Sequence, residues 1–111
     1  MDINNGEIWF AKFAFEEDVN QIIYRPVIVL NVETFQVLVL KVTKVNPLKN
    51  DFFDLPILYW KEAKLSVRST AKISKTLYIP RIEFDFKIGD LLEYDFKAIQ
   101  ELFIKFVSIK Q

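Results

Sequence analysis

The stretch Tyr24-Arg25-Pro26-Val27-Ile28-Val29-Leu30 decides the fold. Its last four residues form an unbroken, mostly β-branched apolar run, which is typical of a pleated and largely buried strand. Pro26 lacks an amide hydrogen and has a fixed φ, so it belongs at the first residue of a strand and not in its middle. Pro26 also restricts Arg25 to extended backbone. The pattern predicts a buried strand with an arginine held at the edge of the sheet.

An arginine held in this way has two interpretations. Its planar guanidinium offers parallel hydrogen-bond donors, which suit recognition of an anion and above all of a phosphate. An ordinary solvated arginine at a strand end explains the same residues, and the stretch by itself favours that simpler interpretation. The choice depends on what the rest of the chain brings next to Arg25.

Length and composition predict one domain and exclude several chemistries. The chain has 111 residues, of which 51% are apolar, enough for a core without disulfides or metals. It contains no cysteine and no histidine, which excludes thiolate chemistry and the histidine-based nuclease, triad and zinc mechanisms. No signal-peptide pattern is present, and no apolar run approaches the roughly 18 residues that span a bilayer, so we expect a soluble cytoplasmic protein.

The formal net charge is 0, but the charges are unevenly distributed. Residues 1–20 carry a balance of −4 and residues 41–75 a balance of +5. Nucleic-acid binding requires a local positive surface more than a positive total, so the second segment is a candidate RNA-binding surface. Charges that merely solvate a surface would give the same count. The neutral total argues against strong, non-specific binding of nucleic acid.

Local patterns predict a mainly β domain of the α+β class. Segments rich in β-forming residues predict strands at 6–13, 25–30, 35–42, 69–77 and 82–88. The last of these alternates most clearly and places Ile82, Phe84, Phe86 and Ile88 on one buried face, whereas Trp9 is expected to cap an edge. One or two helical turns are predicted within 53–63, with Asp54 as the cap, and a long amphipathic helix at 93–108. We expect a small antiparallel β-barrel with a short inserted helix and a C-terminal helix.

The strands at 25–30 and 35–42 are close enough in sequence to form a hairpin through 31–34. A hairpin brings the outer ends of its two strands together, and here those ends are Arg25 and Thr43. The counts from the turn differ by a few residues, so a bend or a bulge has to absorb the mismatch. The sequence thus predicts that a guanidinium and a hydroxyl lie near each other.

Several anchors in order resemble one known family. They are the opening strand Gly6-Glu7-Ile8-Trp9-Phe10, the Arg25-Pro26 motif before its apolar run, Thr43, and the segments Trp60-Lys61-Glu62-Ala63, Ser69-Thr70-Ala71-Lys72-Ile73 and Lys87-Ile88-Gly89-Asp90-Leu91. Together they are similar to the MazF/PemK-like toxins of type II toxin–antitoxin systems, over nearly the whole chain. Family members often have glycine where Lys64 stands, and their loop before the Arg-Pro motif is often basic, whereas here it holds Glu16, Glu17 and Asp18.

The resemblance implies an SH3-like barrel, a homodimer and a cognate antitoxin. It also implies sequence-specific cleavage of single-stranded RNA, without a metal or other cofactor, to 2′,3′-cyclic phosphate and 5′-hydroxyl ends. The catalytic arginine of the family matches Arg25 and its catalytic Thr/Ser matches Thr43. The candidate RNA-binding residues are Lys44, Ser69, Thr70 and Lys72.

Other interpretations remain to be weighed at the level of sequence. A catalytically silent binding module, or a gyrase-directed toxin like CcdB, could use the same fold. The aromatic side chains Trp9, Tyr24 and Trp60 could stack on bases, although core and interface roles are commoner. The acidic pairs Asp51/Asp54 and Glu83/Asp85 are better explained as solvated surfaces than as a metal site.

Overall fold

The computed structural model describes residues 2–14, 23–44 and 51–110, and the acidic loop Glu16–Asp18 lies outside this part of the chain. The elements in chain order are β1 (Glu7–Lys12), β2 (Tyr24–Val32), β3 (Gln36–Thr43), β4 (Asp54–Pro56), β5 (Thr70–Pro80), η2 (Arg81–Glu83), β6 (Phe84–Asp90) and α1 (Glu93–Lys110). No helix within the described residues has the length and apolar character needed to cross a membrane.

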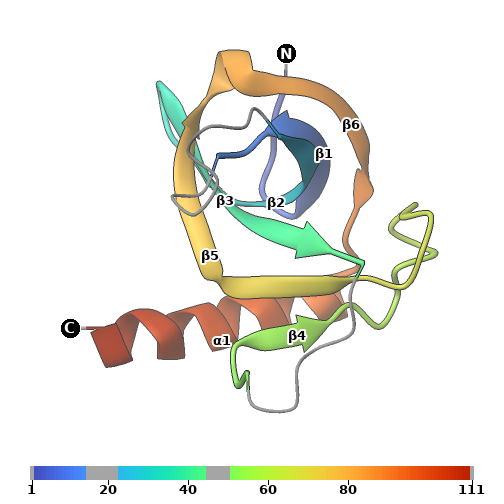
Figure 1. Ribbon diagram of the computed structural model, residues 1–111, viewed down its shortest axis with the longest axis vertical. Helices are drawn as coiled ribbons and strands as arrows, with labels where there is room; N and C mark the ends of the chain where they lie inside the picture. The colour runs from blue at the N-terminus through green and yellow to red at the C-terminus, as the bar shows by residue number, and fades with distance from the viewer. Residues whose placement is uncertain (1, 15–22, 45–50, 111) are drawn as a thin grey trace.

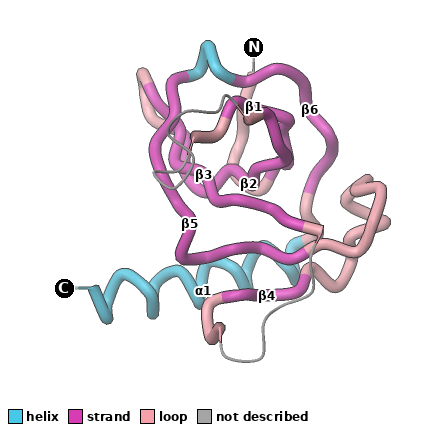
Figure 2. The backbone as a smooth tube through the Cα atoms, viewed as in Figure 1, coloured by secondary structure: helices cyan, strands magenta, loops and turns pink. Residues whose placement is uncertain are grey.

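The strands form one antiparallel sheet in the order β4-β5-β3-β2-β1-β6. The sheet curls strongly, with α1 packed beneath the start of β5 (Figures 1 and 2). β5 bends sharply, since Leu40 pairs with Thr76 but the next residue, Lys41, pairs with Lys72. In the described residues the edge strands β4 and β6 do not pair with each other, so the predicted barrel is not closed. The mainly β, α+β class is confirmed.

The stretch 27–30 is buried on both faces of the sheet. Ile28 and Leu30 pack in a cluster with Ile99 of α1, whereas Val27 and Val29 pack in a second cluster inside the curl. All four side chains are at most 7% exposed. This two-sided burial explains why the run is apolar at every position instead of alternating.

Trp9 and Glu7 lie in the interior, which corrects the expectation that Trp9 caps an edge. The Trp9 indole donates a hydrogen bond of 2.9 Å to Glu7 Oε1, and Lys87 Nζ lies 3.0 Å from Glu7 Oε2. The Asn4 backbone N–H also donates to Glu7 Oε1, at 2.7 Å. Burial raises the pKa of Glu7, but these hydrogen bonds outweigh it and hold the pKa below its ordinary value of 4.5. The cluster joins β1 to the edge strand β6.

The strand predicted at 82–88 begins two residues later and does not alternate cleanly. Ile82 lies in η2 and is 87% exposed, and Phe86 is 53% exposed. The pairing of β6 with β1 skips one residue at Asp85 and another at Ile88. Each bulge turns the following side chains to the other face, which the local sequence does not signal.

The short helix predicted within 53–63 is wrong. Residues 54–56 form β4 against β5, and residues 58–64 form consecutive turns. Asp54 does not cap a helix, because its carboxylate is buried against Lys72 at 2.9 Å. The long C-terminal helix is confirmed, with its Phe96, Leu102, Phe103 and Phe106 packed against the core.

Candidate active site

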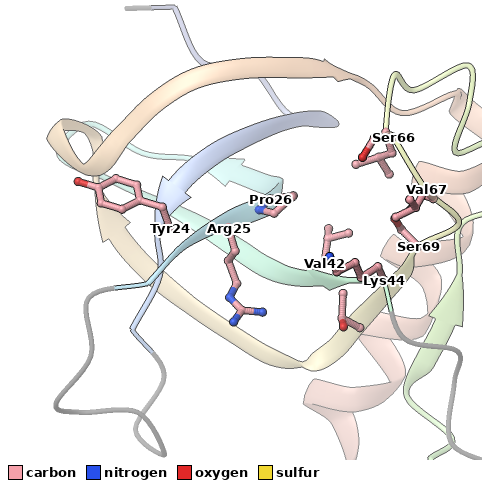
Figure 3. A pocket seen from close by; sticks show the side chains of 10 residues that line it. Tyr24, Arg25, Pro26, Val42, Lys44, Ser66, Val67 and Ser69 are labelled. Carbon is pink, nitrogen blue, oxygen red and sulfur yellow. The ribbon is translucent and has the colours of Figure 1, made fainter.

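A pocket of about 380 Å³ opens where the outer ends of β2 and β3 meet the segment that leads into β5. Figure 3 shows Arg25 and Pro26 on one side of it, Ser66, Val67 and Ser69 on the other, and Val42 and Lys44 between them. Tyr24, Thr43 and Leu65 complete the lining. Two of its side chains are cationic, Arg25 and Lys44, and no described lining residue is acidic, so the pocket suits an anion.

Strand register brings Arg25 and Thr43 to this pocket. The β2–β3 ladder runs as far as Val27 opposite Lys41, and Arg25 and Thr43 each lie two residues beyond that pair, at the outer ends of the two strands. The turn between the strands runs from Glu33 to Gln36, where the Glu33 N–H donates to the Gln36 carbonyl at 2.9 Å. A one-residue bulge at Leu30 absorbs the difference in length between the two arms. Both side chains are partly exposed.

Arg25 is a partly exposed residue of the pocket lining. Within the described part of the chain, none of the ion pairs involves Arg25. A guanidinium that lines a pocket can offer its parallel donors to an incoming anion. This differs from the third arginine of the chain, Arg81, which donates to the carbonyl oxygens of Thr34 and Glu33.

The four predicted RNA-binding residues divide into two groups. Lys44 and Ser69 line the pocket, although the Ser69 hydroxyl donates to the Val67 carbonyl at 2.8 Å. Thr70, the first residue of β5, is only 2% exposed and does not line the pocket. Lys72 lies between Asp54 and Asp51, at 2.9 and 3.7 Å, which occupies its charge. The burial of Thr70 argues against its predicted contact with RNA, and the ion pairs of Lys72 account for the position of that side chain.

Asp51 and Asp54 therefore form ion pairs with Lys72. Within the residues that the structure describes, no group of three or more His, Cys, Asp or Glu side chains is arranged to hold a metal ion. In the other acidic pair, Glu83 and Asp85, the carboxylate of Glu83 lies 3.9 Å from Lys12 Nζ. The charge of Lys72 is compensated locally by the carboxylates of Asp51 and Asp54.

The wall formed by 65–69 is held in place by a tight turn. The Ala63 N–H donates to the Tyr59 carbonyl and the Leu65 N–H to the Trp60 carbonyl, at 3.1 and 3.0 Å. Lys64, which has a φ of 70°, occupies the left-handed position that ends such a turn. Glycine is the residue best suited to that backbone conformation, which explains why family members often have glycine at the position of Lys64.

Asp95 and Gly89 fix this turn to the rest of the fold, and sequence reasoning missed both roles. Asp95 is 3% exposed, and its two carboxylate oxygens accept hydrogen bonds from the N–H groups of Leu58 and Tyr59, at 3.0 and 2.9 Å. A Cβ at Gly89 would lie 2.1 Å from the Ala63 carbonyl oxygen, so only glycine permits this approach. These contacts join residues more than 25 positions apart, for which no local sequence pattern exists.

Sequence reasoning also missed part of the pocket lining. The sequence analysis assigned no role to Leu65, Ser66 and Val67, yet they line the pocket together with Arg25. Their position depends on the pairing of β3 with β5, in which Thr43 lies opposite Thr70. A serine in an exposed turn carries no signal of such a role.

Comparison with known proteins supports the fold. The sequence matches no protein-family model and no curated protein sequence. The structure is similar to MazF from Deinococcus radiodurans, with a TM-score of 0.76 and 14% identity over 97% of this chain and 98% of that one.

Two mycobacterial structures are similar as well. The Mycobacterium tuberculosis toxin MazF-mt6 has a TM-score of 0.69 and 21% identity, over 89% of this chain and 93% of its own. An endoribonuclease in complex with its cognate antitoxin, from a mycobacterial species, has a TM-score of 0.72 and 9% identity, over 96% of both chains. The resemblance inferred from the sequence is confirmed at the level of the fold, and the chain has the fold of the MazF toxins.

Proposed function

We propose that this protein is a metal-independent, sequence-specific endoribonuclease toxin that cleaves single-stranded RNA, such as mRNA. The observation that carries the proposal is that Arg25 and Thr43, chosen from the sequence, line one pocket whose charged side chains are both cationic. The MazF fold supports it further, because solved relatives by structure are described as endoribonucleases. The products are 2′,3′-cyclic phosphate and 5′-hydroxyl ends.

The chemistry requires little of the protein beyond position and charge. The 2′-hydroxyl of the RNA loses its proton to water and attacks the adjacent phosphorus, and the bond to the 5′-oxygen breaks. The nucleophile therefore belongs to the substrate, which fits a chain without cysteine or histidine. The protein holds the 2′-oxygen in line and stabilises the negative charge that develops on the phosphorane oxygens.

Arg25 and Thr43 divide these tasks. The guanidinium of Arg25 donates two parallel hydrogen bonds to the phosphorane oxygens and protonates the leaving 5′-oxygen. An oriented donor side chain of this kind is worth roughly 3–4 kcal/mol of barrier in comparable oxyanion sites. The Thr43 hydroxyl donates to the same phosphate and fixes its orientation. Lys44 and Ser69, on the pocket wall, contact the flanking backbone.

The proposal includes the partners and the architecture of the family. The functional unit is a homodimer of SH3-like barrels in the cytoplasm, and a cognate antitoxin blocks its RNA-binding surface. Exposed apolar side chains on α1, such as Ile104 at 62% and Ile109 at 69%, support burial against another protein surface.

Incubation of the protein with a long mRNA and a chelator tests the proposal. We expect cleavage at defined sites, mapped by primer extension, with cyclic phosphate ends. Arg25→Ala should lower the rate about 10²- to 10³-fold. Arg25→Lys should restore only part of it, because an ammonium keeps the charge but not the fork. Lys105→Ala removes one exposed positive charge from α1, far from the pocket lining, and serves as the control.

Intact RNA with the wild-type protein would refute the enzymatic proposal. Full activity of Arg25→Ala would refute the site while leaving the enzyme. Loss of cleavage on chelation, with recovery on addition of a divalent cation, would refute the metal-independent mechanism.

A further inference from the structure

Three aromatic rings from three neighbouring strands stack beside the pocket. The ring centroid of Phe86 on β6 lies 5.1 Å from that of Phe10 on β1, with 23° between the ring planes. The Phe10 centroid lies 5.9 Å from that of Tyr24 on β2, with 24° between the planes. We call Tyr24, Phe10 and Phe86 the aromatic ladder.

The aromatic ladder is a surface feature and not part of the core. Its outer rings are substantially exposed, Tyr24 at 46% and Phe86 at 53%, and only the central Phe10 is half-buried. The buried pair Trp9 and Phe84 instead meets edge to face, at 83°. Near-parallel rings on an exposed sheet face present flat apolar area for which the described fold makes no other use.

The ladder is continuous with the pocket. The sheet order places β6, β1, β2 and β3 side by side, so the ladder starts at an edge strand and ends next to β3. Its last ring, Tyr24, is itself a lining residue and directly precedes Arg25. Figure 3 shows the side chains of Tyr24 and Arg25 leaving β2 in different directions. Because Tyr24 and Arg25 are adjacent residues of the same lining, an RNA strand with a phosphate at Arg25 passes beside the ladder.

We propose that the aromatic ladder is a base-stacking site for the single-stranded RNA whose phosphate occupies the Arg25 pocket. One base stacks on Tyr24 at the pocket, and a neighbouring base contacts the ladder at Phe86. Every base has a π-face, so this site contributes affinity and position rather than sequence specificity. The inference rests on the proposed function, because it assigns a further part of the same substrate to the surface beside that site.

The test measures binding separately from cleavage. A fluorescent single-stranded oligonucleotide with 2′-O-methyl groups throughout cannot be cleaved by attack of its own 2′-oxygen, and its anisotropy reports affinity. We expect Tyr24→Ala to weaken binding about 5- to 150-fold, the range that loss of one base–aromatic stack produces. Phe86→Ala should weaken it by a smaller factor. Tyr24→Phe keeps the ring and should bind as the wild type does.

Phe35→Ala is the matched control. Phe35 is 85% exposed and lies at the β2–β3 turn, at the opposite end of β2 from Tyr24. Loss of an exposed aromatic ring there should leave affinity unchanged. An oligonucleotide with one abasic position, moved along the strand, should lose most affinity at the position that stacks on Tyr24, and that loss should be absent in Tyr24→Ala.

The outcomes separate this inference from the proposed function. Cleavage of RNA by the wild type, together with unchanged affinity in Tyr24→Ala and Phe86→Ala, would overturn the stacking site alone. Ladder-dependent binding without any cleavage of ordinary RNA would support the stacking site and overturn the nuclease. Ladder variants that change the sedimentation of the protein but not its affinity would assign the face to a second copy of the chain and overturn the inference. Absence of binding by the wild type would overturn it too.

Discussion

Replacement of Asp95 should destabilise the protein through a turn that lies far away in the sequence. The carboxylate is buried on the first turn of α1, and it accepts one hydrogen bond from Leu58 N–H and one from Tyr59 N–H. Asp95→Ala removes both acceptors and leaves two backbone donors unpaired. The turn they belong to leads into the Ser66–Ser69 wall of the pocket.

The magnitude follows from the two bonds. A hydrogen bond to a charged group contributes about 1.5–3 kcal/mol to stability. The side chains of Leu58 and Tyr59 are exposed, so water can reach the freed N–H groups and the lower value applies to each. The expected loss is about 3 kcal/mol in the free energy of unfolding, or roughly 12 °C in Tm for a domain of this size. Asp95→Asn retains one acceptor oxygen and should lose about half of that.

Urea denaturation followed by circular dichroism measures this loss. Glu93→Ala is the control, because Glu93 is an exposed acid in the same first turn of α1 and shares only the interaction with the helix dipole. It should cost less than about 1 kcal/mol. If Asp95→Ala unfolds within about 0.5 kcal/mol of the wild type, the carboxylate does not hold the turn and the reasoning is wrong.

Three further changes test the supports of the fold. Lys64→Gly should raise the free energy of unfolding by about 0.5–1 kcal/mol in urea denaturation, because glycine relieves the left-handed strain at that position. Gly89→Ala should lower Tm in a thermal melt by an amount equivalent to at least about 1–3 kcal/mol, since the new methyl group meets the Ala63 carbonyl. Glu7→Gln should be less stable than the wild type near neutral pH, and the difference should shrink as the pH falls below 4.5, because the lowered pKa of Glu7 stabilises the fold only while the carboxyl is ionised. A difference between Glu7→Gln and wild type that stays constant from pH 7 to pH 3 would contradict that assignment.

The central strand and the hairpin that leads to the pocket could be predicted from the sequence. The run from Val27 to Leu30 predicts a buried strand because every position is apolar. The structure buries its side chains alternately on the two faces of the sheet. Arg25 and Thr43 line one pocket because a hairpin is a local structure whose register follows from its turn. The sequence predicted that the hairpin needs a bend or a bulge, but it did not predict that the bulge lies at Leu30.

The features that sequence reasoning missed depend on contacts between distant segments. Thr70 and Lys72 looked like exposed strand residues until the pairing of β5 with β3 and β4 buried one and neutralised the other. Ile82 and Phe86 continued an alternating pattern that two bulges in β6 interrupt. The turn after β4 resembles a helix locally, yet the acid that organises it is Asp95 on α1.

The account depends most on Arg25 and Thr43 acting on the same phosphodiester, and a double-mutant cycle in single-turnover cleavage tests this directly. Arg25→Ala, Thr43→Ala and the double variant are compared with the wild type on one RNA at saturating protein. Two groups on one phosphate are coupled, so we expect the double variant to lose less activity than the product of the two single losses. Independent, multiplicative losses, or a Thr43→Ala variant with wild-type activity, would contradict the account.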